Sequence, residues 1–250
     1  MGFDKLSPNG LGSMALLTGP APKLATRGFA HRGLHGHGVP ENSRAAILAA
    51  VTVGWGVEID VRASRDGRAI VFHDATLERL TGERGPVAER SAAELARIKL
   101  LRSVETIPPL EEALALVAGR VPLLIELKAP DRGVGALCMA VRKSLAHYPG
   151  PVGVMSFNPE VPRWFATHAP SVARGLVVTE ARRDWRGRLE RWLSVRHAKP
   201  HFLAYDVRCL PSALPARLRA KGMPVFAWTV RTSTERERAR LHADAPIFEQ

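Results

Sequence analysis

The chain is short of cysteine and of long apolar runs. Its 250 residues include two cysteines, Cys138 and Cys209, which lie far apart and outside any C-x-x-C pattern. This argues against a disulfide framework or a cysteine-based zinc site and favours a reducing, cytoplasmic compartment. The apolar run nearest the N-terminus, residues 14–17, is broken by Gly19-Pro20. It is too short for the core of a signal peptide, and no run reaches the length of a transmembrane helix.

Acidic residues are scarce relative to basic ones. The 36 Lys and Arg residues outnumber the 24 Asp and Glu residues, so the net charge is +12 and the pI is about 10.7. A basic surface favours anionic partners such as phosphate esters, lipid head groups or nucleic acid. An arginine-rich codon usage would explain the same balance without any partner. No helix-turn-helix, RNP or zinc-finger pattern accompanies the charge, so nucleic acid is not the expected partner.

Glu58 and Asp60 form the most informative pair in the chain. The segment 56–61 has the composition of a buried strand, and residues two apart on a strand point to the same face. Two carboxylates side by side in an apolar strand are costly unless a positive charge lies between them. A hard divalent cation, Mg²⁺ or Ca²⁺, supplies that charge through oxygen ligands. The structural alternative is a bridging Arg or Lys from a neighbouring strand.

His73 is predicted to lie beside this pair. Asp66-Gly67 separates two apolar runs, which is a strong signal for a β-hairpin. Folding the hairpin about position 66 places His73 roughly opposite Ile59 and Asp60. An imidazole beside a metal site suits metal-assisted hydrolysis.

Strands and helices alternate from residue 28 to the end of the chain. Such alternation predicts a parallel α/β sheet, and eight units in about 220 residues favour a closed TIM (β/α)₈ barrel over an open sheet. We expect a β-hairpin extension after the second strand, an inserted segment at about 75–107 with a helix at 91–98, and a loose lead-in at 1–26. The expected strands are 28–31, 56–61, 122–127, 152–157, 173–178, 202–206, 224–230 and 245–248. The expected helices are 45–50, 110–118, 135–147, 159–168, 181–196, 212–221 and 233–242.

The barrel hypothesis gathers the chemically rich residues on one rim. The active site of such a barrel lies at the C-terminal ends of the strands. Glu126 ends a predicted strand and is a candidate third carboxylate ligand. Lys128, two residues further, is suited to a substrate phosphate as a point charge or to an ion pair with Glu126 or Asp60. Trp228 is suited either to the wall of the pocket or to the core.

His31 and Arg32 follow the first predicted strand. The guanidinium fork of Arg32 matches phosphate oxygens, and Gly33 permits close approach of the backbone. Together with His73, His31 provides two imidazoles, one to accept a proton and one to donate it. His35 and His37, in the Gly-rich loop that follows, are expected to be solvated.

The helix predicted at 181–196 is rich in arginine and carries an apolar stripe. The stripe consists of Trp185, Leu189, Trp192 and Leu193. A helix lying on a membrane surface has this composition, so a weak membrane contact is one interpretation. An outer helix of a barrel needs the same stripe for packing, which is the alternative.

A series of short motifs carries a resemblance to a known family. The motifs are His31-Arg32-Gly33, Pro40-Glu41-Asn42-Ser43, Glu58-Ile59-Asp60-Val61, Asp66-Gly67, His73-Asp74, Leu77, Thr81-Gly82, Ile107-Pro108, Leu110-Glu111-Glu112, Glu126-Leu127-Lys128, Ser156-Phe157 and Trp228-Thr229-Val230. In this order, over roughly residues 27–249, they resemble the glycerophosphodiester phosphodiesterases. The chain departs from the family pattern at Glu249, where many members carry Asp.

The resemblance implies a single TIM-barrel catalytic domain over 27–250. It implies hydrolysis of a small-molecule glycerophosphodiester to sn-glycerol 3-phosphate and an alcohol, with the segment 75–107 covering the site. The alternative on the same site is a lysophospholipase D or phospholipase-type phosphodiesterase acting on membrane lipids. The resemblance assigns one divalent cation, Mg²⁺ or Ca²⁺, to Glu58, Asp60 and Glu126, the roles of base and acid to His31 and His73, and the substrate phosphate to Arg32 and Lys128.

Overall fold

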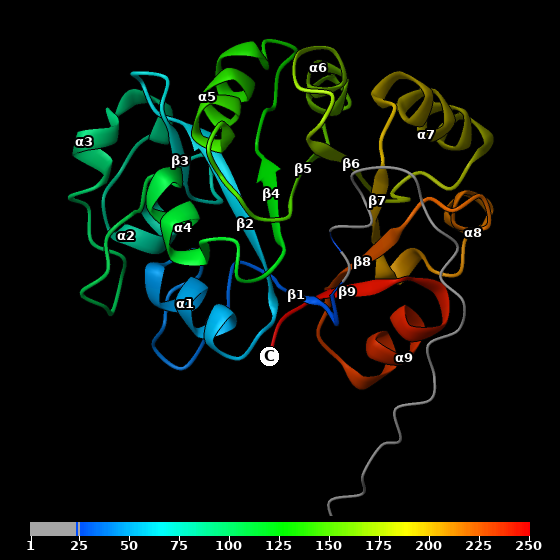
Figure 1. Ribbon diagram of the computed structural model, residues 1–250, viewed down its shortest axis with the longest axis horizontal. Coiled ribbons are helices and arrows are strands. Elements are labelled where there is room, and N and C mark those ends of the chain that lie inside the picture. The colour runs from blue at the N-terminus through cyan, green and yellow to red at the C-terminus, as the bar shows by residue number, and fades with distance from the viewer. Residues whose placement is uncertain (1–23, 25) are drawn as a thin grey trace, which may run out of the picture.

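Eight parallel strands close into a barrel. The computed structural model describes residue 24 and residues 26–250 (Figure 1), so most of the expected lead-in lies outside the described residues. Each barrel strand pairs in parallel with the next, and the last strand pairs with the first through Phe29↔Ile247 and Ala30↔Phe248. The predicted TIM barrel is therefore confirmed. Its strands are β1 (Phe29–Ala30), β2 (Gly56–Ala63), β4 (Leu123–Leu127), β5 (Val152–Ser156), β6 (Ala173–Val178), β7 (Phe202–Asp206), β8 (Val225–Val230) and β9 (Ala245–Phe248).

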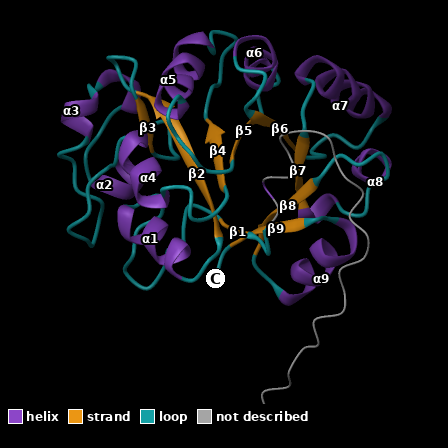
Figure 2. Cartoon of the chain, viewed as in Figure 1, coloured by secondary structure: helices purple, strands orange, loops and turns teal. Residues whose placement is uncertain are grey.

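Helices surround the strands on the outside (Figure 2). Side-chain caps determine where several of them begin. Ser43 accepts a hydrogen bond from the Ala46 amide, and Asp184 accepts one from the Gly187 amide. The helix expected at 181–196 therefore begins only at Trp185. The outer helices are α1 (Arg44–Thr52), α4 (Leu110–Val117), α5 (Gly135–Leu145), α6 (Glu160–His168), α7 (Trp185–Ala198), α8 (Ala213–Arg219) and α9 (Ser233–His242), and a short 3₁₀ turn, η3 (Val207–Cys209), follows β7.

The hairpin and the inserted segment form one side of the molecule. β3 (Ala69–Val71) runs antiparallel to β2 with Val61 opposite Val71, which is the predicted register. The insert contains α2 (Glu78–Thr81), η2 (Val87–Glu89) and α3 (Ala92–Leu95), so the helix expected at 91–98 is only one turn long. A separate apolar cluster holds the insert against the hairpin: Ile70, Phe72, Leu77, Val87, Leu95, Leu100 and Ile107.

The interior of the barrel is filled by aliphatic side chains and three phenylalanines. Phe29 and Phe202 both pack against Phe226, at ring-centroid distances of 5.3 and 5.1 Å. Gly175 on β6 leaves room for this cluster, because a Cβ atom there would overlap the ring of Phe202. Leu24, at the edge of the expected lead-in, is also buried in this cluster. The packed interior leaves the polar site at the C-terminal ends of the strands.

Candidate active site

Three carboxylates meet at the C-terminal end of the barrel. Glu58 and Asp60 lie on one face of β2, and Glu126 on β4 stands in register with Asp60. Glu58 and Asp60 are completely buried and Glu126 is nearly so. One oxygen from each of the three lies within 4.8 Å of the others. The predicted cluster is therefore brought together by the pairing of β2 with β4.

Two cations contact this cluster, but they do not neutralise it. The Lys128 ammonium lies 2.5 Å from a Glu126 oxygen and 3.0 Å from Asp60 Oδ1. Arg32 Nε lies 3.2 Å from Asp60 Oδ2, while its Nη1 donates to Glu41. Both basic residues predicted to contact a substrate phosphate are thus held in ion pairs. Among the described residues, Glu58 accepts one hydrogen bond, from the Arg32 backbone N–H at 3.0 Å.

The unsatisfied charge identifies the donor set as one that fits a divalent cation. Glu58 Oε1 is buried and has no hydrogen-bond partner among the described residues. Burial raises the pKa of Glu58 well above its usual range, and the charges of Asp60 and Glu126 raise it further. Burial raises the pKa of Glu126 to about 7, although Lys128 opposes this shift. A bound cation would remove both penalties, because it favours the ionised form of each carboxylate.

Asp60 is the carboxylate that stays ionised without a metal. Burial opposes its charge, but Lys128 and Arg32 outweigh burial and lower its pKa. Asn42 holds the same residue from two sides, since its Nδ2 donates to Asp60 Oδ2 at 3.0 Å and its Oδ1 accepts from the Asp60 amide at 3.2 Å. In the sequence Asn42 is visible only as part of the motif Pro40-Glu41-Asn42-Ser43. Its buried, bidentate role depends on the loop folding back over β2.

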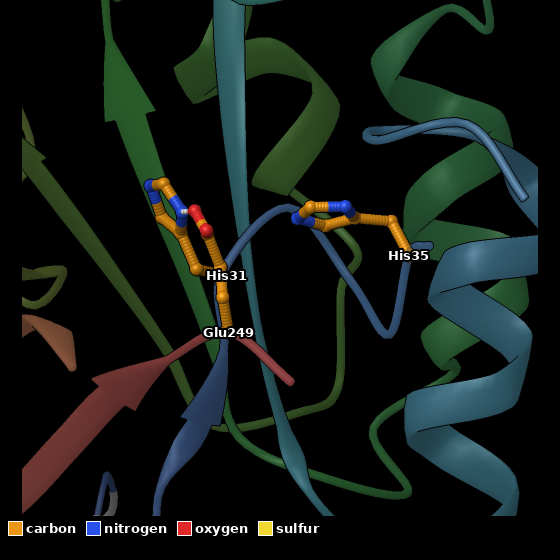
Figure 3. A group of neighbouring side chains, drawn as sticks. All are labelled: His31, His35 and Glu249. Atoms are coloured by element: carbon orange, nitrogen blue, oxygen red, sulfur yellow. Dashed lines mark hydrogen bonds and ion pairs between the residues drawn. The ribbon is translucent and has the colours of Figure 1, made fainter. Parts of the chain in front are cut away.

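His31 is oriented by Glu249, which follows β9. The two side chains lie together in Figure 3, with 2.6 Å between His31 Nδ1 and Glu249 Oε1. Arg231 donates two hydrogen bonds to the same carboxylate, at 2.7 and 2.9 Å. The other imidazole nitrogen, Nε2, lies 3.9 Å from Glu58 Oε2. The residue noted only as a departure from the family pattern is thus the partner of the predicted base.

Glu249 is ionised under ordinary conditions. Burial opposes its charge, but the hydrogen bonds from His31 and Arg231 outweigh burial and lower its pKa to about 2. His35 completes this corner and faces the His31–Glu249 pair in Figure 3. His35 is half-buried, contrary to the expectation of a solvated loop, whereas His37 is exposed.

His73 is oriented by the residue that follows it. Its Nδ1 lies 2.7 Å from Asp74 Oδ1, and Arg79 binds the Asp74 carboxylate from the other side. Arg79 also makes two hydrogen bonds to Glu41, which in turn binds Arg32. This chain of ion pairs links the inserted segment to the loop after β1. The His73 position opposite Ile59, predicted from the hairpin, is confirmed by the hydrogen bond from the Phe72 amide to the Asp60 carbonyl.

A cavity of about 190 Å³ opens beside Glu126 and Lys128. Its lining includes Arg62 and Phe157, and the Phe157 ring packs edge-on against Trp228 at 5.3 Å. Trp228 donates its indole N–H to the Ala204 carbonyl at 2.9 Å. Trp228 is therefore anchored to the barrel wall, and Phe157 is the aromatic side chain that faces the cavity.

Most of the chain matches the model of one known protein family. The model of the glycerophosphoryl diester phosphodiesterase family matches residues 31–246. The chain belongs to this family. Its members are phosphoric diester hydrolases, and the matched segment contains every residue that the sequence motifs assigned to the site.

Individual proteins agree with this family assignment. A glycerophosphodiester phosphodiesterase of Bacillus altitudinis is 36% identical over 132 residues, which is 50% of this chain and 49% of that protein. One from Caldanaerobacter subterraneus is 28% identical over 86% of this chain and 90% of its own length. A phosphodiesterase of Oleispira antarctica, solved in complex with the product sn-glycerol 3-phosphate, is 27% identical with a TM-score of 0.79, covering 91% of this chain and 94% of its own.

Proposed function

We propose that the chain hydrolyses glycerophosphodiesters to sn-glycerol 3-phosphate and an alcohol. The observation that carries this proposal is the pairing of each histidine with its own carboxylate. His31 is held through Nδ1 by Glu249, with its Nε2 3.9 Å from Glu58. His73 is held through Nδ1 by Asp74, and its ring feels the charge of Asp60. Anchoring Nδ1 leaves Nε2 of each ring for proton transfer. The product bound by the Oleispira antarctica relative supports the same substrate class.

The three carboxylates are proposed to hold one divalent cation, Mg²⁺ or Ca²⁺. When bound, such a cation would neutralise the negative charge that builds up on the phosphate in the transition state. Arg32 and Lys128 both contact Asp60. They are proposed to bind the phosphate oxygens when a substrate phosphate replaces the carboxylates as their ion-pair partner. Asn42 keeps Asp60 in position throughout, because its two hydrogen bonds fix the carboxylate and the backbone of β2 together.

The two histidines are proposed to divide the proton transfers. His31 takes the proton from the nucleophile, which is water or the neighbouring glycerol hydroxyl, and Glu249 stabilises the imidazolium that forms. His73 gives its proton to the departing alkoxide. Burial lowers the pKa of His73, with Lys128 and Arg32 also lowering it, while Asp60 and Asp74 act in the opposite direction. The carboxylates around His73 thus retain part of its ability to carry the proton that it donates.

Release of sn-glycerol 3-phosphate tests the proposal directly. Glycerophosphocholine, glycerophosphoethanolamine and a lysophospholipid would each be incubated with the protein in Mg²⁺, Ca²⁺ or EDTA. Cation-dependent release of sn-glycerol 3-phosphate from the first two is expected. Cleavage of the lysophospholipid alone, to lysophosphatidic acid and the head-group alcohol, would favour the membrane-lipid alternative. No release under any condition would reject the reaction.

Substrates with different leaving groups separate the two histidine roles. His73→Ala should lose turnover of glycerophosphocholine but keep much of it on a glycerophosphoryl nitrophenyl ester, because nitrophenolate leaves without a proton donor. His31→Ala should lose both. His37→Ala, at an exposed loop position, serves as the matched control. Equal losses on both substrates in His73→Ala would contradict its role as the acid.

A further inference from the structure

The apolar stripe of α7 faces away from the barrel. Trp185, Leu189, Trp192 and Leu193 are exposed by 61, 47, 48 and 51%. The opposite face is the buried one: Gly187 lies against the backbone of Arg182, Ala198 is buried and Val195 packs against the core. The interpretation of the stripe as a packing surface for an outer barrel helix is therefore wrong. Within the described part of the chain, these four residues are a large share of the exposed large hydrophobic side chains.

Basic side chains surround this stripe. Arg186, Arg188 and Arg196 are exposed on the helix and form no ion pair within residues 26–250. Two of them lie over the tryptophans, with the Arg186 guanidinium 5.4 Å from the Trp185 ring and that of Arg196 4.9 Å from Trp192. Between Trp185 and Ala198 the sequence contains one acidic residue, Glu190. The face is thus both apolar and strongly positive.

Exposed apolar side chains surrounded by arginines indicate which kind of surface α7 can bind. We propose that α7 docks on an anionic lipid surface, with the tryptophans and leucines at the level of the head groups and the arginines on lipid phosphates. The helix is too short and too polar to cross a bilayer, and none in the described part of the chain is long and apolar enough to do so. Insertion would therefore be confined to the interface.

A second copy of the chain fits this face poorly. A two-fold symmetric contact places the same helix on both sides, so each arginine row would face another arginine row. The net charge of +12 adds repulsion at longer range. An anionic membrane provides the complementary charge that a second copy lacks.

The position of α7 sets how the catalytic end meets the membrane. α7 follows β6, so its first turn lies near the end of the barrel that carries the site, and the helix packs beside α6 on the outside of the barrel (Figure 1). A helix lying flat on lipid would hold this side of the barrel against the membrane. The docking surface shares no residue with the proposed catalytic set, so it can be tested independently of the reaction.

Vesicle flotation with the full chain tests the proposal. The protein should float with vesicles of phosphatidylcholine mixed with phosphatidylglycerol and not with phosphatidylcholine alone. Raising NaCl from about 0.1 M to about 1 M shortens the Debye length from about 10 Å to about 3 Å and should weaken binding at least tenfold. Failure of the wild-type protein to float with anionic vesicles at low salt would overturn the proposal.

Variants with matched controls show whether α7 is the surface responsible. Trp185→Ser with Trp192→Ser, and separately Arg186→Glu with Arg188→Glu, should each lower vesicle binding at least tenfold. The controls are Leu241→Ser, an exposed apolar residue of α9, and Arg217→Glu with Arg236→Glu, two exposed arginines of α8 and α9. Leu241→Ser should leave vesicle binding within about twofold of wild type. Arg186→Glu with Arg188→Glu should lower vesicle binding more than Arg217→Glu with Arg236→Glu does.

Light scattering and turnover complete the test. The wild type should be a monomer without lipid, and all the variants should keep wild-type hydrolysis of the preferred soluble substrate. A dimer that the tryptophan variant dissociates, without vesicle binding, would assign the face to a second copy and overturn the lipid proposal. Equal vesicle binding by both α7 variants and wild type would overturn it as well.

Discussion

Replacing Glu249 by Gln tests the orientation of His31 with little change in shape. The carboxylate accepts from His31 Nδ1 through one oxygen and from Arg231 through both oxygens. A glutamine has one acceptor oxygen and one NH₂ group, so it cannot satisfy both partners. If its oxygen faces His31, its NH₂ group faces Arg231. If its NH₂ group faces His31, the proton of the neutral ring moves to Nε2, and the proposed base is disabled.

The size of the loss follows from these two arrangements. Losing one hydrogen bond to a charged group costs about 1.5–3 kcal/mol, which corresponds to roughly 10- to 150-fold in rate. The wrong tautomer in a comparable carboxylate–histidine pair costs about 10⁴-fold. We therefore expect kcat to fall between about 10- and 10⁴-fold. KM should change little, because Glu249 is not among the groups proposed to bind the substrate.

Steady-state kinetics with two companion variants provide the measurement. Arg231→Gln keeps the contact between Glu249 and His31, so its kcat should fall less than that of Glu249→Gln. Glu249→Asp keeps the charge on a shorter side chain and should recover part of the rate lost in the glutamine variant. A folded Glu249→Gln protein with kcat within about threefold of wild type would refute the orientation role. A loss confined to KM would refute it too.

Three further predictions concern stability and metal binding. Glu58→Gln removes one of three crowded buried acids, so the melting temperature in EDTA should rise. The increase in melting temperature that Mg²⁺ or Ca²⁺ produces should disappear, and an increase that remains would contradict the ligand assignment. Burial lowers the pKa of His201 to about 4, so between about pH 6.5 and 4 the unfolded chain binds more protons and stability falls as pH falls; His201→Asn should flatten the melting temperature across this window, and an unchanged slope would contradict this account. Gly175→Ala should destabilise the barrel by about 1–3 kcal/mol, or about 2–12 °C in melting temperature, because its Cβ overlaps Phe202, whereas Gly133→Ala, with open space around it, should not.

The local sequence pattern was sufficient to predict most of the strands and helices. The predicted strands at 173–178, 202–206 and 245–248 and the helix at 233–242 have the bounds that the structure shows. The period of apolar residues and the turn signals between them depend on near neighbours in the chain, so they are visible in one dimension. The rim position of Glu58, Asp60 and Glu126 follows from the same pattern, because parallel barrel strands place their C-terminal ends together.

The tertiary structure alone decided which side chains are partners. His31 and Glu249 are 218 positions apart, and they meet only because β9 closes the barrel against β1. Asn42 reaches Asp60 because a loop folds over β2, and Lys128 contacts two acids because β2 and β4 are in register. The stripe on α7 has the same sequence whether it faces the barrel or solvent. In the folded chain Gly187 and Ala198 are buried and Val195 packs against the core, whereas both tryptophans lie on the exposed face of the helix.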